Sequence, residues 1–143
     1  MNIPDLDTSQ IQIFVQGMGA IARLNNSAAK AAMLRGYYET WRIRRREGPP
    51  FEALAGAEFS PAHAREILDH TALRHEFINA CLFIAYADER YSPAEQTKIA
   101  WFADALAVPP PTLDALETAH RLFHHAPRQI CATADRPARR RRY

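Results

Sequence analysis

Residues 87–95 read ADERYSPAE, and the second half of this stretch carries the strongest local structural pattern in the chain. Ser92 is suited to cap a helix, Pro93 suits its first position, and the Glu95 carboxylate is expected to bind the backbone N–H of Ser92. The residues after it repeat at helical spacing, and so do those before it, which predicts a helix on each side. The stretch is therefore the expected joint of a helical hairpin whose core residues are Phe77, Ala80, Cys81, Ile84, Ala85, Ile99, Phe102, Ala103 and Leu106.

Helical periodicity dominates the rest of the chain, and no strand-like alternation persists. One helix is expected to begin after Thr8 or Ser9 and to end near Leu24, and a second to follow Ser27 and end near 46. A helical turn at 51–56 precedes a helix capped by Ser60, which is expected to continue past a bend at Thr71 to about residue 87. A last helix follows the prolines of 108–112. We predict a single bundle-like all-α domain of about six to seven helices over 1–127, followed by a flexible Arg-rich tail, 128–143.

An internal repeat connects two parts of the chain. Residues 14–26 align with 77–89, so that Phe14 corresponds to Phe77, and a two-residue offset then aligns Ser27 with Ser92. Each copy is a helix, a polar turn, a serine cap and a second amphipathic helix, a likeness that unrelated helical hairpins also show. One hairpin cannot bury its apolar face alone, so two related hairpins are expected to pack against each other.

These residues resemble the tellurite-resistance TerB-like family. Its signature is approximately A-D-G-x-(apolar)-x-x-x-E, and Ala87, Asp88, Tyr91 and Glu95 fit it. The resemblance covers about 73–107, extends more weakly over 9–46, and leaves out the tail. It implies an all-helical fold of two related hairpins and a role in stress or tellurite response. Glu89 replaces the usual glycine, and Asn25 and Lys30 stand at the matching positions of the first hairpin, so a carboxylate pair is missing there.

Composition and charge limit the class of protein. The chain has 143 residues, a net charge of +2, and two cysteines, Cys81 and Cys131, far apart in sequence, which favours a reducing compartment. No signal peptide is expected from MNIPDLDTSQ, and the longest apolar run, 80–87, is too short to span a membrane. We therefore expect a cytoplasmic protein. Basic ends flank an acidic middle region, which predicts an oppositely charged partner or docking of the tail on the protein's own surface.

Three acidic residues of the joint form a candidate metal site. Asp88, Glu89 and Glu95 offer carboxylate oxygens to a divalent cation such as Ca²⁺, but Arg90 stands where a second acidic ligand of an EF-hand loop would be. The structural alternative is that Glu95 completes the capping box and Asp88 ends its helix. We favour the capping interpretation.

Glu117, His120 and His124 lie on one face of the last expected helix and form a second candidate metal site. Glu-x-x-His is half of the di-iron pattern of four-helix bundles, which also needs a second such motif and two further glutamates. The nearest partner motif, Glu66 to His70, has the wrong spacing. The alternative is an amphipathic helix with histidines near its boundary and end.

Two arginine-rich stretches are candidate polyanion sites. RIRRR (42–46) ends a helix, where cations are favoured, and the tail contains Arg139, Arg140, Arg141 and Arg142. No nucleic-acid-binding motif accompanies them, so nucleic acid is a weak candidate partner.

The sequence favours a non-enzymatic protein. No G-x-S-x-G motif or phosphate loop occurs, and five glycines leave little material for one. The leading prediction is a TerB-like module that acts through protein contacts, with or without a divalent cation. The alternatives are a di-iron-like oxidase and a polyanion-binding adaptor that uses the tail.

Overall fold

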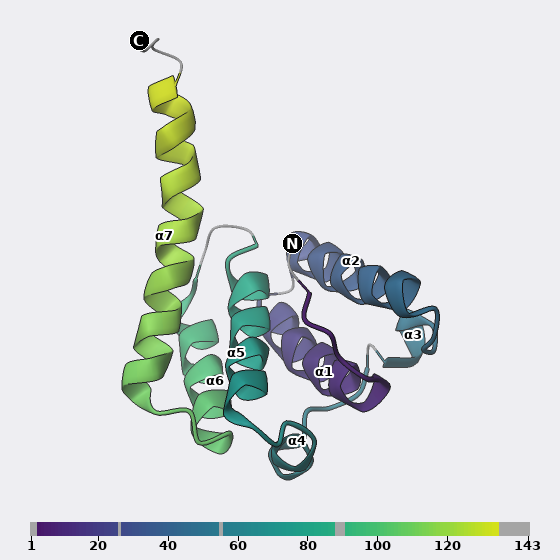
Figure 1. The fold of residues 1–143 in the computed structure, drawn as a ribbon. Helices are drawn as coiled ribbons and strands as arrows, with labels where there is room; N and C mark the ends of the chain where they lie inside the picture. The colour runs from purple at the N-terminus through teal and green to yellow at the C-terminus, as the bar shows by residue number, and fades with distance from the viewer. Residues whose placement is uncertain (1–2, 26, 55, 88–90, 135–143) are drawn as a thin grey trace.

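A computed structural model describes residues 3–25, 27–54, 56–87 and 91–134, with side chains up to Leu122 in the last helix. This part of the chain forms seven helices and no strand, and they pack in one domain, which confirms the all-α bundle (Figure 1). No helix among the described residues combines the length and the apolar character that crossing a membrane requires. The helices are α1 (Thr8–Leu24), α2 (Ala28–Arg45), α3 (Phe51–Leu54), α4 (Pro61–Ile67), α5 (Thr71–Ala85), α6 (Pro93–Ala105) and α7 (Pro110–Ala134).

Two helical hairpins, α1–α2 and α5–α6, form the centre of the bundle. Helix α1 packs against α5 and α6 of the other hairpin, while α3 and α4 connect the two along the chain. Helix α7 packs on α5 and α6, and its second half extends beyond the bundle (Figure 1). Its backbone continues across Pro127 to Ala134, past the predicted domain boundary at 127. Residues 135–143 lie outside the described residues, so the flexible tail stays a prediction.

The contact between α1 and α5 joins equivalent positions of the sequence repeat. The Phe14 and Phe77 rings meet edge to face with centroids 5.5 Å apart, and both side chains are fully buried. Gly17 permits this approach, because a Cβ added there would lie 2.2 Å from a ring carbon of Phe77. The two hairpins pack against each other, as expected, and they do so through their first helices, α1 and α5.

The structure differs from the sequence predictions at two helix starts. Asp7, rather than Thr8 or Ser9, caps α1, and its side chain forms a capping box with Gln10. The helix expected to run through Thr71 is instead two helices, because α4 ends at Ile67 and His70 caps α5. Leu68, between them, is fully buried, so the break inserts an apolar side chain into the core.

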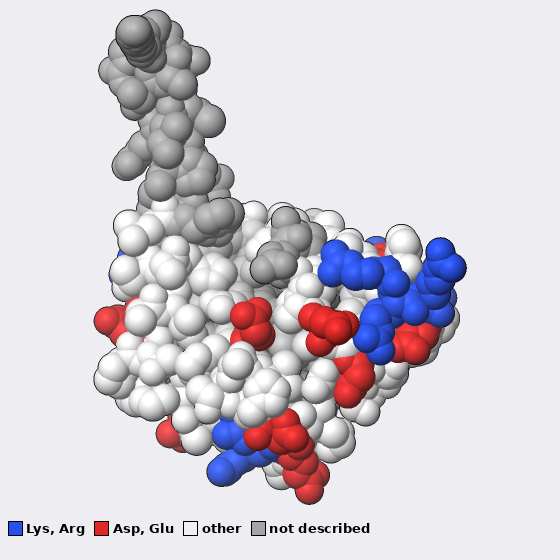
Figure 2. All heavy atoms as spheres, in the orientation of Figure 1, with Lys and Arg blue, Asp and Glu red and all other residues white. Residues whose placement is uncertain are grey.

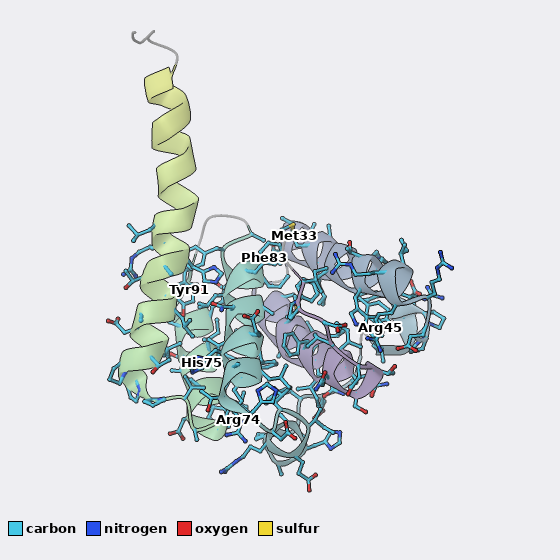
Figure 3. The ribbon with its side chains drawn as sticks, viewed as in Figure 1. Met33, Arg45, Arg74, His75, Phe83 and Tyr91 are labelled. Carbon is cyan, nitrogen blue, oxygen red and sulfur yellow. The ribbon has the colours of Figure 1, made fainter. Side chains whose placement is uncertain are left out.

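Arg74 stabilises this break and the end of α6. Its guanidinium donates to the carbonyl oxygens of Leu68 at 2.6 Å, Leu106 at 3.2 Å and Arg65 at 3.3 Å. These carbonyls belong to the C-terminal ends of α4 and α6, where the helix dipole favours a cation. Figure 3 shows Arg74 close to α4 and the start of α5.

A pair of glycine substitutions tests the α1–α5 contact. Gly17→Ala forces its methyl group into the Phe77 ring and should lower the free energy of unfolding by about 1–3 kcal/mol. Gly36→Ala, inside α2 with nothing within 4 Å of the added carbon, should raise it by about 0.5–1 kcal/mol. Urea unfolding measures both values. A Gly17→Ala protein as stable as the wild type would show that the helices are not in close contact there.

Candidate functional site

The turns of the two hairpins meet at one place, which we call the hairpin joint and define by five residues. The Asn25 side-chain amide, after α1, donates to the Ser92 hydroxyl at the start of α6 over 3.3 Å. Ser27 caps α2, and Ser92 caps α6 in the same manner. The third helical position after each cap carries a fully buried charged residue. The joint consists of Asn25, Ser27, Lys30, Ser92 and Glu95.

The capping box predicted from SPAE is present. The Ser92 hydroxyl accepts from the Glu95 backbone N–H at 3.2 Å, and Glu95 Oε1 accepts from the Ser92 backbone N–H at 2.9 Å. The same Oε1 lies 3.1 Å from the Ser92 hydroxyl. One carboxylate oxygen of Glu95 is thus fully engaged at the start of α6, where a negative charge is favoured.

The second oxygen of Glu95 forms a buried ion pair across the hairpins. Lys30 Nζ donates to Glu95 Oε2, and both side chains have no exposed surface. Lys30 sits at the N-terminal end of α2, where the helix dipole disfavours a cation, and the Glu95 carboxylate compensates its charge. A buried charge without a partner would cost several kcal/mol. The pair therefore couples the positions of the two hairpins, because moving one hairpin relative to the other would separate the buried charges.

Glu95 is one of the three predicted ligands of a divalent cation, and in the structure it contacts Ser92 and Lys30. Asp88 and Glu89 lie outside the described residues. The capping role predicted for Glu95 is confirmed, whereas the helix-ending role of Asp88 and a Ca²⁺ site at the three carboxylates stay predictions. A cation there would have to compete with the Lys30 ammonium for Glu95.

Removing one charge of the buried pair should lower the free energy of unfolding more than removing both charges. Lys30→Met leaves the buried Glu95 carboxylate without its ammonium partner, and should lower the free energy of unfolding by about 3–5 kcal/mol. Adding Glu95→Gln, whose amide oxygen still accepts from Ser92, should recover a large part of that loss. Lys98→Met, at the chain's other lysine, is the control and should cost less than about 1 kcal/mol.

Urea unfolding of the single and double variants measures this coupling. Equal losses in Lys30→Met and in the double variant would show that the two side chains do not depend on each other.

A second cluster of polar and aromatic side chains lies between α5 and α7. Tyr91, beside α7 in Figure 3, donates its hydroxyl hydrogen to Glu117 Oε2. His120 Nε2 lies 3.2 Å from Asn79 Oδ1, and its ring stacks on Tyr86 with centroids 6.1 Å apart. Burial, followed by the Glu117 carboxylate, raises the pKa of the Tyr91 phenol. These contacts hold α7 against the rest of the bundle.

Among the described residues, no three His, Cys, Asp or Glu side chains gather closely enough to hold a metal ion. Glu117 and His120 are both directed at partners on neighbouring segments, and the His124 side chain lies outside the described part of the chain. The di-iron-like alternative therefore gains no further ligand from the residues described, and it stays a prediction.

Acidic groups accompany the arginines at the end of α2. Arg42 pairs with Glu39 at 3.5 Å, and Arg45 pairs with Asp5 at 3.1 Å and Glu47 at 3.0 Å. Figure 2 shows Lys and Arg atoms interleaved with Asp and Glu atoms over the end formed by α2 and α3. This surface is a network of opposite charges rather than a uniform basic patch. Arg139, Arg140, Arg141 and Arg142 lie outside the described residues.

A surface groove of about 470 Å³ is lined by residues of α1, of α6 and of the segment between α3 and α4, and we call it the Trp101 groove. Trp101 is 47 % exposed at its edge, although the side chain is large and apolar. Phe59, from the segment between α3 and α4, lies close to both α6 aromatics, edge-on to Trp101 and tilted against Phe102, with its ring centroid 4.5 Å from that of Phe102. The groove is lined chiefly by Arg23, Glu58, Phe59, Lys98, Trp101 and Phe102.

Sequence reasoning placed Lys30 at the position equivalent to Glu95 but missed the ion pair between them, and it also missed the Trp101 groove. The opposite charges at these two equivalent positions could have indicated the pair. Trp101 could have been found from periodicity, because it falls beside the stripe of Ile99 and Phe102 rather than on it. The groove itself depends on where the segment of Phe59 lies, and no local pattern specifies that.

Comparisons of the chain with protein-family models, with curated proteins and with solved structures found no match. The resemblance to the TerB-like family accordingly remains a prediction from the residues of the two hairpins.

Proposed function

We propose that the protein is a non-catalytic, TerB-like helical module of the cytoplasm that acts in stress or tellurite response through contacts with a partner protein at the Trp101 groove. The observation that carries the proposal is the 47 % exposure of Trp101 at the edge of a groove with an aromatic floor. Exposed tryptophan costs free energy in water, and tryptophan is enriched at the energetic centres of protein interfaces. The association with stress or tellurite comes from the family resemblance.

Structural roles of the reactive side chains support a non-catalytic function. Glu95 caps a helix and pairs with Lys30, and Glu117 accepts from Tyr91. Cys81 is fully buried, and burial raises the pKa of its thiol, so it behaves as a small apolar side chain. The proposal requires no cation, and Ca²⁺ binding remains a separate prediction.

Cells that carry the gene provide the test. Chromosomal replacement by Trp101→Ser should lower survival in potassium tellurite to the level of a deletion strain, because the variant lacks the apolar contact for the partner. Leu122→Ser is the matched control, since Leu122 is 63 % exposed on α7, away from the groove residues, and this strain should survive like the wild type. Immunoblots should show equal amounts of each protein.

The two parts of the proposal fail separately. A deletion strain that tolerates tellurite and oxidants as well as the wild type would contradict the stress role. A deletion strain that is sensitive, together with a Trp101→Ser strain that is not, would contradict the assignment of the groove.

A further inference from the structure

The charged residues that line the Trp101 groove are more often basic than acidic. Lys98 lies over the neighbouring aromatic rings, with Nζ 4.8 Å from the Trp101 centroid and 5.8 Å from that of Phe102. No carboxylate in the described part of the chain forms an ion pair with Lys98. Arg23 lines the groove from α1, and Glu58 is the acidic residue of the lining. The described lining residues thus include two basic side chains and one acidic side chain.

The floor of the groove is suited to one large apolar side chain. Phe102 is fully buried beneath it, Phe59 is half-buried, and the Trp101 ring lies 6.4 Å from Phe59, measured between centroids. Sites that hold small ligands are concave and have volumes between about 300 and 1,000 Å³. The groove, at about 470 Å³, falls in this range.

We propose that the Trp101 groove binds an acidic segment of a partner protein, which places one large apolar side chain against Phe59 and Trp101 and neighbouring carboxylates against Lys98 and Arg23. This inference rests on the proposed function and specifies the chemistry of the partner. Opposite charges at the rim of an interface direct association and select the partner. The chain's own tail, 136–143, has five arginines and no acid, so its charge has the same sign as those of Lys98 and Arg23.

The indole N–H signals of the chain's two tryptophans allow a direct binding assay. Trp41 is 1 % exposed and its indole N–H donates to the Leu6 carbonyl oxygen at 2.9 Å, so it serves as an internal reference for Trp101. The full chain, labelled with ¹⁵N, is titrated with the peptide acetyl-Glu-Asp-Phe-Asp-Glu-amide and followed by ¹H–¹⁵N correlation spectra. Matched peptides replace the four acids by lysine, or the phenylalanine by alanine.

The acidic phenylalanine peptide should shift the Trp101 indole signal and the amides of Phe59 and Lys98 until saturation, while the Trp41 indole stays in place. Both matched peptides should bind more weakly by about tenfold. Lys98→Glu should weaken binding of the acidic peptide by a similar factor, and Lys98→Arg should bind the peptide as the wild type does. Added salt should weaken binding, because exposed charges are screened over about 10 Å at 0.1 M.

The outcomes separate this inference from the proposed function. Equal binding of the acidic and basic peptides would overturn the acidic specificity and leave the groove as a docking site. A Trp101 indole that no peptide moves, in a protein whose Trp101→Ser strain is tellurite-sensitive, would also overturn it. Shifts that depend on protein concentration without peptide would assign the groove to a second copy of the chain. No shift, together with a tolerant Trp101→Ser strain, would contradict both proposals.

Discussion

The buried ion pair between Lys30 and Glu95 is the constraint on which the arrangement of this protein depends. Each charge lies at the start of a helix in a different hairpin, and neither has any contact with water. Glu95 is favoured at its helix start and held by Ser92, whereas Lys30 is disfavoured at its own. The pair therefore allows two apolar hairpins to approach in one relative position, since any sliding of one against the other would separate buried opposite charges.

The joint also determines the shape of the surface that we assign to a partner. Arg23 belongs to α1 and Trp101 to α6, so the walls of the groove come from different hairpins. These hairpins are tied together by the ion pair at one end and by the Phe14–Phe77 contact along α1 and α5. A rigid joint keeps the groove preformed, which lowers the ordering cost of binding a flexible segment.

Local sequence patterns specified most of the helices and the predicted capping box, because caps and apolar periodicity act within a few residues. The repeat also aligned Phe14 with Phe77, and the two rings are in contact in the structure. Two features of the structure could not be predicted from local sequence patterns. The break before α5 depends on the burial of Leu68 and on the guanidinium of Arg74, which reaches a carbonyl of α6 distant in sequence. The partner of Glu95 is 65 positions away, and a pattern for capping has no means of revealing it.

Crystals of the full chain grown with Mn²⁺, examined by anomalous scattering, test the central claim most directly. Manganese resembles the hard divalent cations in its preference for carboxylate oxygen and gives an anomalous signal of its own. The account predicts that Lys30 Nζ lies within hydrogen-bonding distance of Glu95 Oε2 and that Oε1 lies on the Ser92 backbone N–H, with Mn²⁺ in the crystal. Mn²⁺ coordinated by Glu95, with the Lys30 side chain turned away, would contradict it and make the joint a metal site.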